Sequence, residues 1–169
     1  MNVFDFAMEI ERSGRKFYRN MAAKAGTAGV RTIFSMMAED EQELLERFRA
    51  MKATVRSTTM QDSSSLESAG NIFKDVLNER EALQINDNME AYHYVMRAEA
   101  AICRLYEDAA QREPNPEVQG LLRRIATEER RELESLRRLY DFVNAPNEFL
   151  AWGEFSNLNE FHNFGRDEG

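Results

Sequence analysis

The sequence predicts an all-α protein, an antiparallel four-helix bundle with one long crossover, a short extra helix and an aromatic C-terminal tail. Apolar residues recur at helical spacing through four long segments. Only three prolines and eight glycines occur among 169 residues, so these segments run unbroken. Two of the three links are short and one is long, which favours antiparallel neighbours joined by a crossover between the second and third helices.

The first two helices are predicted over residues 2–25 and 27–53, which form the first half of the bundle. Gly26 is a natural stop for the first helix. Thr27 is a suitable cap for the second.

The long crossover is predicted over residues 54–86. Its first part, residues 54–70, is rich in Ser and Thr and has no apolar period, which indicates a loop. Residues 71–78, NIFKDVLN, are expected to form the short extra helix.

The second half is predicted over residues 87–144. Asp87 followed by Glu90 resembles a capping box, and this third helix is expected to end before Pro114. Asn115 and Pro116 are a good cap and first-turn residue for the fourth helix.

Pro146 is expected to end the fourth helix, so that the bundle spans residues 1–145 and a tail spans 146–169. The tail has too many aromatic residues for an idle disordered segment, namely Phe149, Trp152, Phe155, Phe161 and Phe164. We expect it to pack on the bundle or on a partner.

Charge and composition exclude several classes of function. The net charge of −8 argues against a nucleic-acid or anionic-membrane partner. No apolar run is long enough to span a bilayer, and acidic residues interrupt the N-terminal segment where a signal peptide needs an apolar core. The single Cys103 forms neither an internal disulfide nor a four-cysteine metal site, and is expected to be a buried small residue. We expect a cytoplasmic protein.

The two halves of the chain resemble each other. MEIERSGRKFYRNMAAK aligns with MRAEAAICRLYEDAAQR at an offset of 88, which matches Glu11 with Glu99. MMAEDEQELLERF aligns with RIATEERRELESL at an offset of 87, which matches Glu41 with Glu128. Chance similarity between amphipathic helices is the alternative explanation.

One glutamate in each long helix falls within the apolar stripe: Glu11, Glu41, Glu99 and Glu128. Glu129 and Arg130 are expected to be solvated. A lone acid of this kind usually lies at the edge of a core and extends into solvent. Four buried carboxylates, however, would cost several kcal/mol each unless they are paired or bound to metal. Two divalent cations balance four carboxylates, and oxygen ligands suit iron or manganese in a four-helix bundle.

The chain resembles the rubrerythrin-like branch of the ferritin-like superfamily through AMEIERSGRKFY, MMAEDEQELLERF, AEAAICRLYEDAA and IATEERRELESL. The closing FVNAPNEFLAWGEFSNLNEF is similar to the tail of its short members, which lack a rubredoxin domain. The resemblance implies a ferritin-like bundle, a di-iron or di-manganese site held by the four glutamates, and peroxide or dioxygen reduction or iron handling. It also implies an oxidoreductase of peroxidase or oxidase type, a homodimer and an external electron donor.

Both metal-ligand histidines that the family pattern expects are replaced, by Leu44 and Arg131. Arg131 either neutralises part of the acidic cluster by bidentate pairing or extends outward and leaves the site open. Glu132 is a candidate for a replacement oxygen ligand. Tyr18 and Tyr106 either hydrogen-bond the carboxylates or pack in the core.

Neither histidine offers a substitute ligand. Glu90 and His93 form a literal Glu-x-x-His, but they lie on a polar face, and His162 lies in the tail. Two hypotheses therefore stand: a di-metal oxidoreductase, or a metal-free bundle in which a buried Arg–Glu network supports a structural or interaction role.

Overall fold

The computed structural model describes residues 1–56, 58–67 and 79–161, with the last part of the final helix, from residue 146, described by its backbone alone. Five helices are present in these residues: α1 (Val3–Lys24), α2 (Ala28–Thr54), α4 (Glu79–Ala82), α5 (Asn88–Arg112) and α6 (Pro116–Phe161). The short helix predicted over residues 71–78 lies outside the described residues. No helix among the described residues has the length and apolar character needed to cross a membrane.

The caps predicted from the sequence set the helix starts. Thr27 accepts a hydrogen bond from the backbone N–H of Val30, and Asp87 accepts from the N–H groups of Met89 and Glu90. Asn115 caps α6 in the same way, with Pro116 in the first turn.

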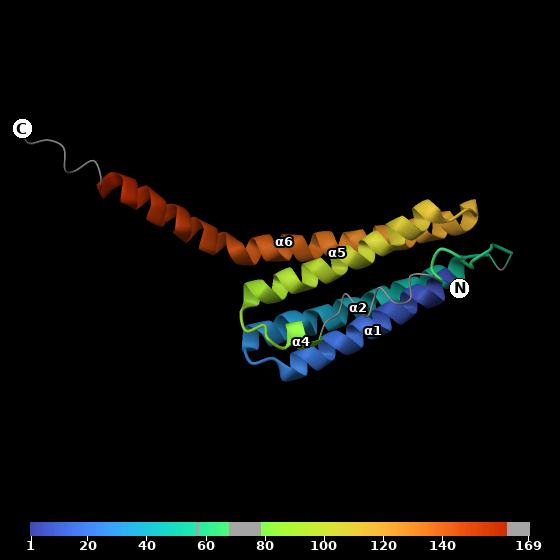
Figure 1. The fold of residues 1–169 in the computed structure, drawn as a ribbon, viewed down its shortest axis with the longest axis horizontal. Coiled ribbons are helices and arrows are strands. Elements are labelled where there is room, and N and C mark those ends of the chain that lie inside the picture. The colour runs from blue at the N-terminus through green and yellow to red at the C-terminus, as the bar shows by residue number, and fades with distance from the viewer. Residues whose placement is uncertain (57, 68–78, 162–169) are drawn as a thin grey trace, which may run out of the picture.

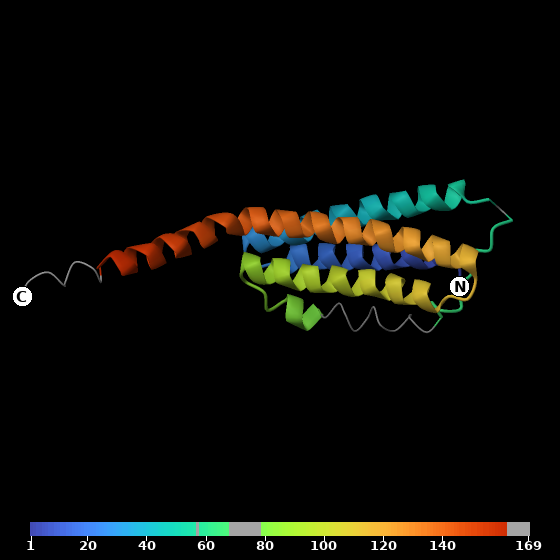
Figure 2. The same ribbon diagram turned by 90° about the horizontal axis from the view of Figure 1, so that it is seen from above.

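The four long helices form two antiparallel pairs, α1 with α2 and α5 with α6 (Figure 1). The end of α2 and the start of α5 lie at opposite ends of the bundle (Figures 1 and 2). The crossover therefore connects the two ends of the bundle. This arrangement confirms the predicted ferritin-like bundle.

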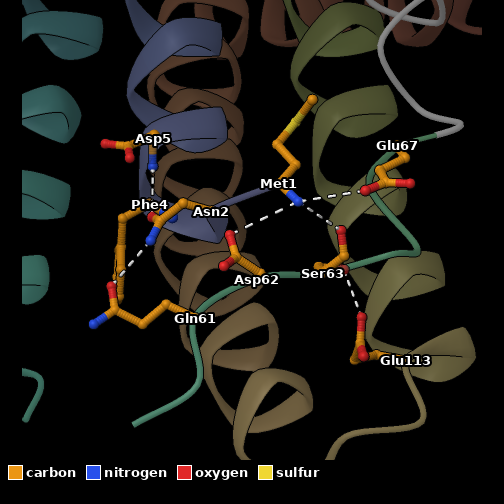
Figure 3. A network of polar contacts seen from close by, with 9 residues as sticks. All are labelled: Met1, Asn2, Phe4, Asp5, Gln61, Asp62, Ser63, Glu67 and Glu113. Carbon is orange, nitrogen blue, oxygen red and sulfur yellow. Dashed lines mark hydrogen bonds and ion pairs between the residues drawn. The ribbon is translucent and has the colours of Figure 1, made fainter. Parts of the chain in front are cut away.

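A polar network ties the first part of the crossover to the start of α1 and the end of α5 (Figure 3). The Ser63 hydroxyl donates to the Glu113 carboxylate at 2.5 Å, and the Ser63 N–H donates to the Met1 carbonyl at 2.8 Å. The Val3 N–H donates to the Gln61 carbonyl, also at 2.8 Å. These bonds hold the crossover against the bundle at the end where it leaves α2.

Pro146 does not end the fourth helix, contrary to the prediction. α6 continues to Phe161, bends as it leaves the bundle and extends away from it (Figures 1 and 2). A proline inside a helix removes one backbone hydrogen bond and bends the axis, but the helix resumes when the following residues favour it. The described backbone of the tail therefore does not pack on the bundle, and packing on a partner stays a prediction.

The core consists of two apolar clusters at the two ends of the bundle. The first is built around Phe4, Phe48, Tyr106, Leu122 and Ile125. The second is built around Tyr18, Phe34, Met37, Tyr94 and Leu136. All four long helices contribute to both clusters.

Candidate metal centre

Four glutamates lie where the helices pass from one apolar cluster to the other. Glu11, Glu41, Glu99 and Glu129 come one from each long helix, and they are 1%, 2%, 3% and 2% exposed. Every helix thus buries one acid at the middle of the bundle, between two layers of apolar side chains.

The fourth acid in this layer is Glu129, not Glu128. The expectation that Glu128 points inward and that Glu129 is solvated is wrong. Glu128 lies at the edge of the bundle, where its carboxylate accepts from Arg131 at 2.6 Å and pairs with Arg47 at 3.4 Å. The sequence held the signal for Glu129, because Glu11 with Glu99 and Glu41 with Glu129 share one offset of 88 residues.

Gly14 makes room for the Glu41 carboxylate. A Cβ atom at position 14 would lie 2.4 Å from Glu41 Oε1 and 2.8 Å from its carboxyl carbon. Gly14 lies one turn after Glu11 on α1, so a side chain there would occupy the space in which the two acids meet.

Tyr18 holds one of the acids directly. Its hydroxyl donates a buried hydrogen bond to Glu99 Oε1 at 2.6 Å. The Tyr106 hydroxyl is equally buried but has no hydrogen-bond partner. Burial, with the nearby Glu129 and Glu11 carboxyls, raises the pKa of Tyr106 well above its usual value. Both tyrosines therefore keep their protons at neutral pH.

Burial favours the neutral form of the four central acids. Burial raises the pKa of Glu11 well above its usual value, and the neighbouring Glu41 raises it further. Burial also raises the pKa of Glu41 and of Glu129. It raises the pKa of Glu99 to about 7, against the hydrogen bond from Tyr18, which lowers it. Without a cation beside them, burial and the neighbouring carboxyls make these groups harder to ionise.

No cation is paired with the four acids in the part of the chain that the structure describes. Arg131 extends outward, with its side chain 65% exposed, and forms its ion pair with Glu128. Arg131 therefore extends outward and leaves the cluster open, which is the second of the two alternatives for this residue. It does not form a buried Arg–Glu network.

Glu132 adds a fifth acid beside the cluster. It follows Glu129 by three residues on α6, and both of its carboxylate oxygens are buried and without a hydrogen-bond partner. Burial raises its pKa well above the usual value, and Glu99 and Glu129 raise it further. Leu44, which follows Glu41 by three residues, is buried and offers no ligand atom.

The remaining candidates lie away from this layer. Glu90 and His93 are exposed, and the His93 ring contacts Tyr140 across 3.1 Å from Nε2 to the hydroxyl oxygen. Cys103 is buried, and burial raises the pKa of its thiol to about 11, so the thiol is unreactive at neutral pH. His162 lies outside the described residues.

The number of acids and the type of donor atom fit a metal centre. The positions of the carboxyl groups in this structure do not, because they are not arranged around a common point. One oxygen each of Glu11, Glu41 and Glu129 is buried without a partner, and all-oxygen donors suit hard or borderline cations. Yet no three His, Cys, Asp or Glu side chains of the described residues converge closely enough to hold an ion. Metal binding would require the carboxyl groups to turn from contacts with one another toward a common ion.

A helical bundle with a long crossover and a central layer of buried glutamates defines a protein of the ferritin-like class. A family model described as Rubrerythrin matches residues 2–140, which is most of the chain. The chain therefore belongs to the rubrerythrin family. No curated protein and no solved structure matches it.

Proposed function

We propose that the protein binds two divalent iron or manganese ions in the central layer and serves in the reduction of peroxide or dioxygen. The observation that supports this proposal is the layer of buried carboxyl groups, most of which have an unpartnered oxygen, with no ion pair to a cationic side chain among the described residues. Four such groups balance two divalent ions, as in other di-metal bundles.

Because the pKa values of the central acids are raised, protons compete with metal ions for their carboxyl groups. Ligand carboxyls must lose their protons to bind an ion, so metal affinity should increase with pH and binding should release protons. Ionising these buried acids without a cation costs free energy. At higher pH, a bound cation should therefore stabilise their ionised form.

Glu11, Glu41, Glu99 and Glu129 would hold the metal, with Glu132 as an additional oxygen donor. Bound iron or manganese would supply the one-electron chemistry that peroxide or dioxygen reduction needs. The Tyr18 hydroxyl donates its proton in a hydrogen bond to Glu99 Oε1, and this bond fixes the orientation of the Glu99 carboxyl group. The apolar clusters above and below the layer exclude bulk water. Electrons would come from an external donor.

The experiment is a titration of metal-free protein with Fe²⁺ under anaerobic conditions and with Mn²⁺, followed by calorimetry and by proton release. We expect near-stoichiometric binding with release of protons. Glu129→Gln should lower the affinity by at least about tenfold, because it removes a ligand. Glu128→Gln, the same change one residue earlier, should leave the affinity unchanged, since Glu128 is paired with arginines at the edge.

Two results would contradict the proposal. One is that neither ion binds the folded wild-type protein, which would leave a metal-free bundle with a structural role. The other is that Glu128→Gln and Glu129→Gln weaken binding equally, which would place the ions elsewhere. Circular dichroism of both variants controls for loss of fold.

A further inference from the structure

A cavity of about 360 Å³ opens between α2 and α6 beside the carboxylate layer. Its walls include charged residues of both signs, contributed by the two helices. They are Asp40, Glu43, Arg47, Arg131, Glu132 and Arg138. Leu44 and Ser135 complete the lining.

Two of the three arginines in the lining form ion pairs with glutamates. Arg47 pairs with Glu43 at 3.5 Å and with Glu128 at 3.4 Å. Arg131 donates to the other oxygen of Glu128 at 2.6 Å. Arg138, farther along α6, is the remaining cation of the lining.

Two acids of the lining form neither an ion pair nor a hydrogen bond in the described residues. Asp40 on α2 is exposed and lies within range of the charge of Arg47, whereas the carboxyl group of Glu132 on α6 is buried. Both oxygens of Glu132 are buried, so this side chain has lost its water without gaining a protein partner. Burying a carboxyl group without a partner is unfavourable in free energy. A cation bound for a short time would supply that partner.

Glu132 also connects the cavity to the layer of acids. The charges of Glu99, Glu129 and Glu11 act on Glu132, and the charge of Asp40 acts on both Glu132 and Glu99. An ion between Asp40 and Glu132 would therefore lie within electrostatic range of the central carboxylates.

We propose that this cavity is a transit site, in which Asp40 and Glu132 bind a hydrated divalent cation on its way to the central layer. The inference rests on the proposed function. Two carboxylates leave most of the coordination positions to water, so the site binds weakly and releases its ion readily. Glu132 then has two successive partners, the ion in the cavity and the ions in the layer.

The first test is the rate of metal uptake, followed by stopped-flow absorbance with Co²⁺ alone. Asp40→Asn should slow uptake about tenfold without changing the final number of ions bound, because it removes charge that attracts the cation. Glu39→Gln, the same change of charge one residue earlier and outside the cavity lining, should change the rate less than about twofold. Ser135→Trp should also slow uptake, because it fills the cavity without changing its charge.

The second test separates the transit site from the central layer. In a Glu11→Gln/Glu129→Gln double variant, Mn²⁺ should still broaden the amide NMR signals of residues near Asp40 and Ser135, and adding Asp40→Asn should abolish that broadening. The proposal is overturned if the double variant shows no broadening there, or if Asp40→Asn and Glu39→Gln slow uptake equally. A wild-type protein that shows broadening at the cavity but fills no central site would instead refute the proposed function alone.

Discussion

The α1–α2 half and the α5–α6 half place matching acids on matching helices, but they surround these acids differently. Under the offset of 88 residues, Glu11 corresponds to Glu99, and Glu41 to Glu129. All four are buried. The scaffold of the site is thus repeated, while several of the residues around it are not.

Three of the differences between the halves lie at or beside the central acids. Gly14 corresponds to Ile102, Leu44 to Glu132, and Asp40 to Glu128. The first half therefore provides space for a carboxylate, and the second half provides an extra carboxylate. Glu128 is paired with two arginines, whereas Asp40 has no ion pair in the described residues.

The largest expected effect is the dependence of stability on pH in the metal-free protein. The pKa of Glu99 is raised from 4.5 to about 7, so the folded state binds a proton that the unfolded state has lost between these values. The free energy of unfolding should therefore fall as pH rises through this window, by about 3 kcal/mol for this residue.

Urea denaturation over the range from about pH 4 to about pH 8 measures this change. Glu99→Gln should make the profile less steep, because it removes one of the buried acids that titrate. A metal-free protein whose stability rises over this range would mean that the central acids are ionised and paired.

Glu132→Leu makes the second half match the first at this position. It removes an unpartnered buried acid, so the metal-free protein should gain about 2 kcal/mol of stability near neutral pH. The same variant should bind metal more weakly. Denaturation with and without Mn²⁺ measures both effects, and a loss of stability without metal would show that Glu132 has a partner.

Tyr18→Phe and Tyr106→Phe compare the same position in the two halves. Tyr18→Phe removes a 2.6 Å hydrogen bond to a buried carboxyl and should cost about 1–2 kcal/mol. Tyr106→Phe removes a hydroxyl without a partner and should leave stability unchanged or slightly higher. Equal losses in urea denaturation of the two variants would contradict this difference.

Gly14→Ala and Gly120→Ala test the space around Glu41. Both changes favour a helix, but only at position 14 does the new Cβ meet a carboxylate, since nothing lies within 4 Å at Gly120. Gly120→Ala should gain about 0.5–1 kcal/mol. Gly14→Ala should lack that gain and weaken metal binding, as thermal denaturation and metal titration would show. Equal gains would mean that Glu41 moves aside without cost.

The helices were predictable because local signals mark their ends. Thr27, Asp87 and Asn115 act within a few residues of the chain, and each caps the helix that it was predicted to cap. Pro146 was misleading, because a proline lowers helix stability at one point without deciding whether the next residues resume the helix.

Three of the four central acids were also recognisable from helical spacing, as Glu11, Glu41 and Glu99 lie within clear apolar stripes. The fourth was not, because Glu128 and Glu129 are adjacent and differ by only 100° around the helix. Which of them faces inward depends on the rotation of α6 against α5. The outward direction of Arg131 follows from the same rotation, since Arg131 and Glu128 lie three residues apart and form an ion pair on the outside.

The continuation of α6 past Pro146 sets how far its end lies from the bundle. Sixteen residues of helix follow residue 145, which at the rise of an α-helix is roughly 24 Å. A molecule attached to the far tip of this arm would be carried on a spacer outside the bundle, remote from the buried acids. The cavity between α2 and α6, in contrast, lies on the flank of the bundle, where its lining reaches Glu132 beside these acids.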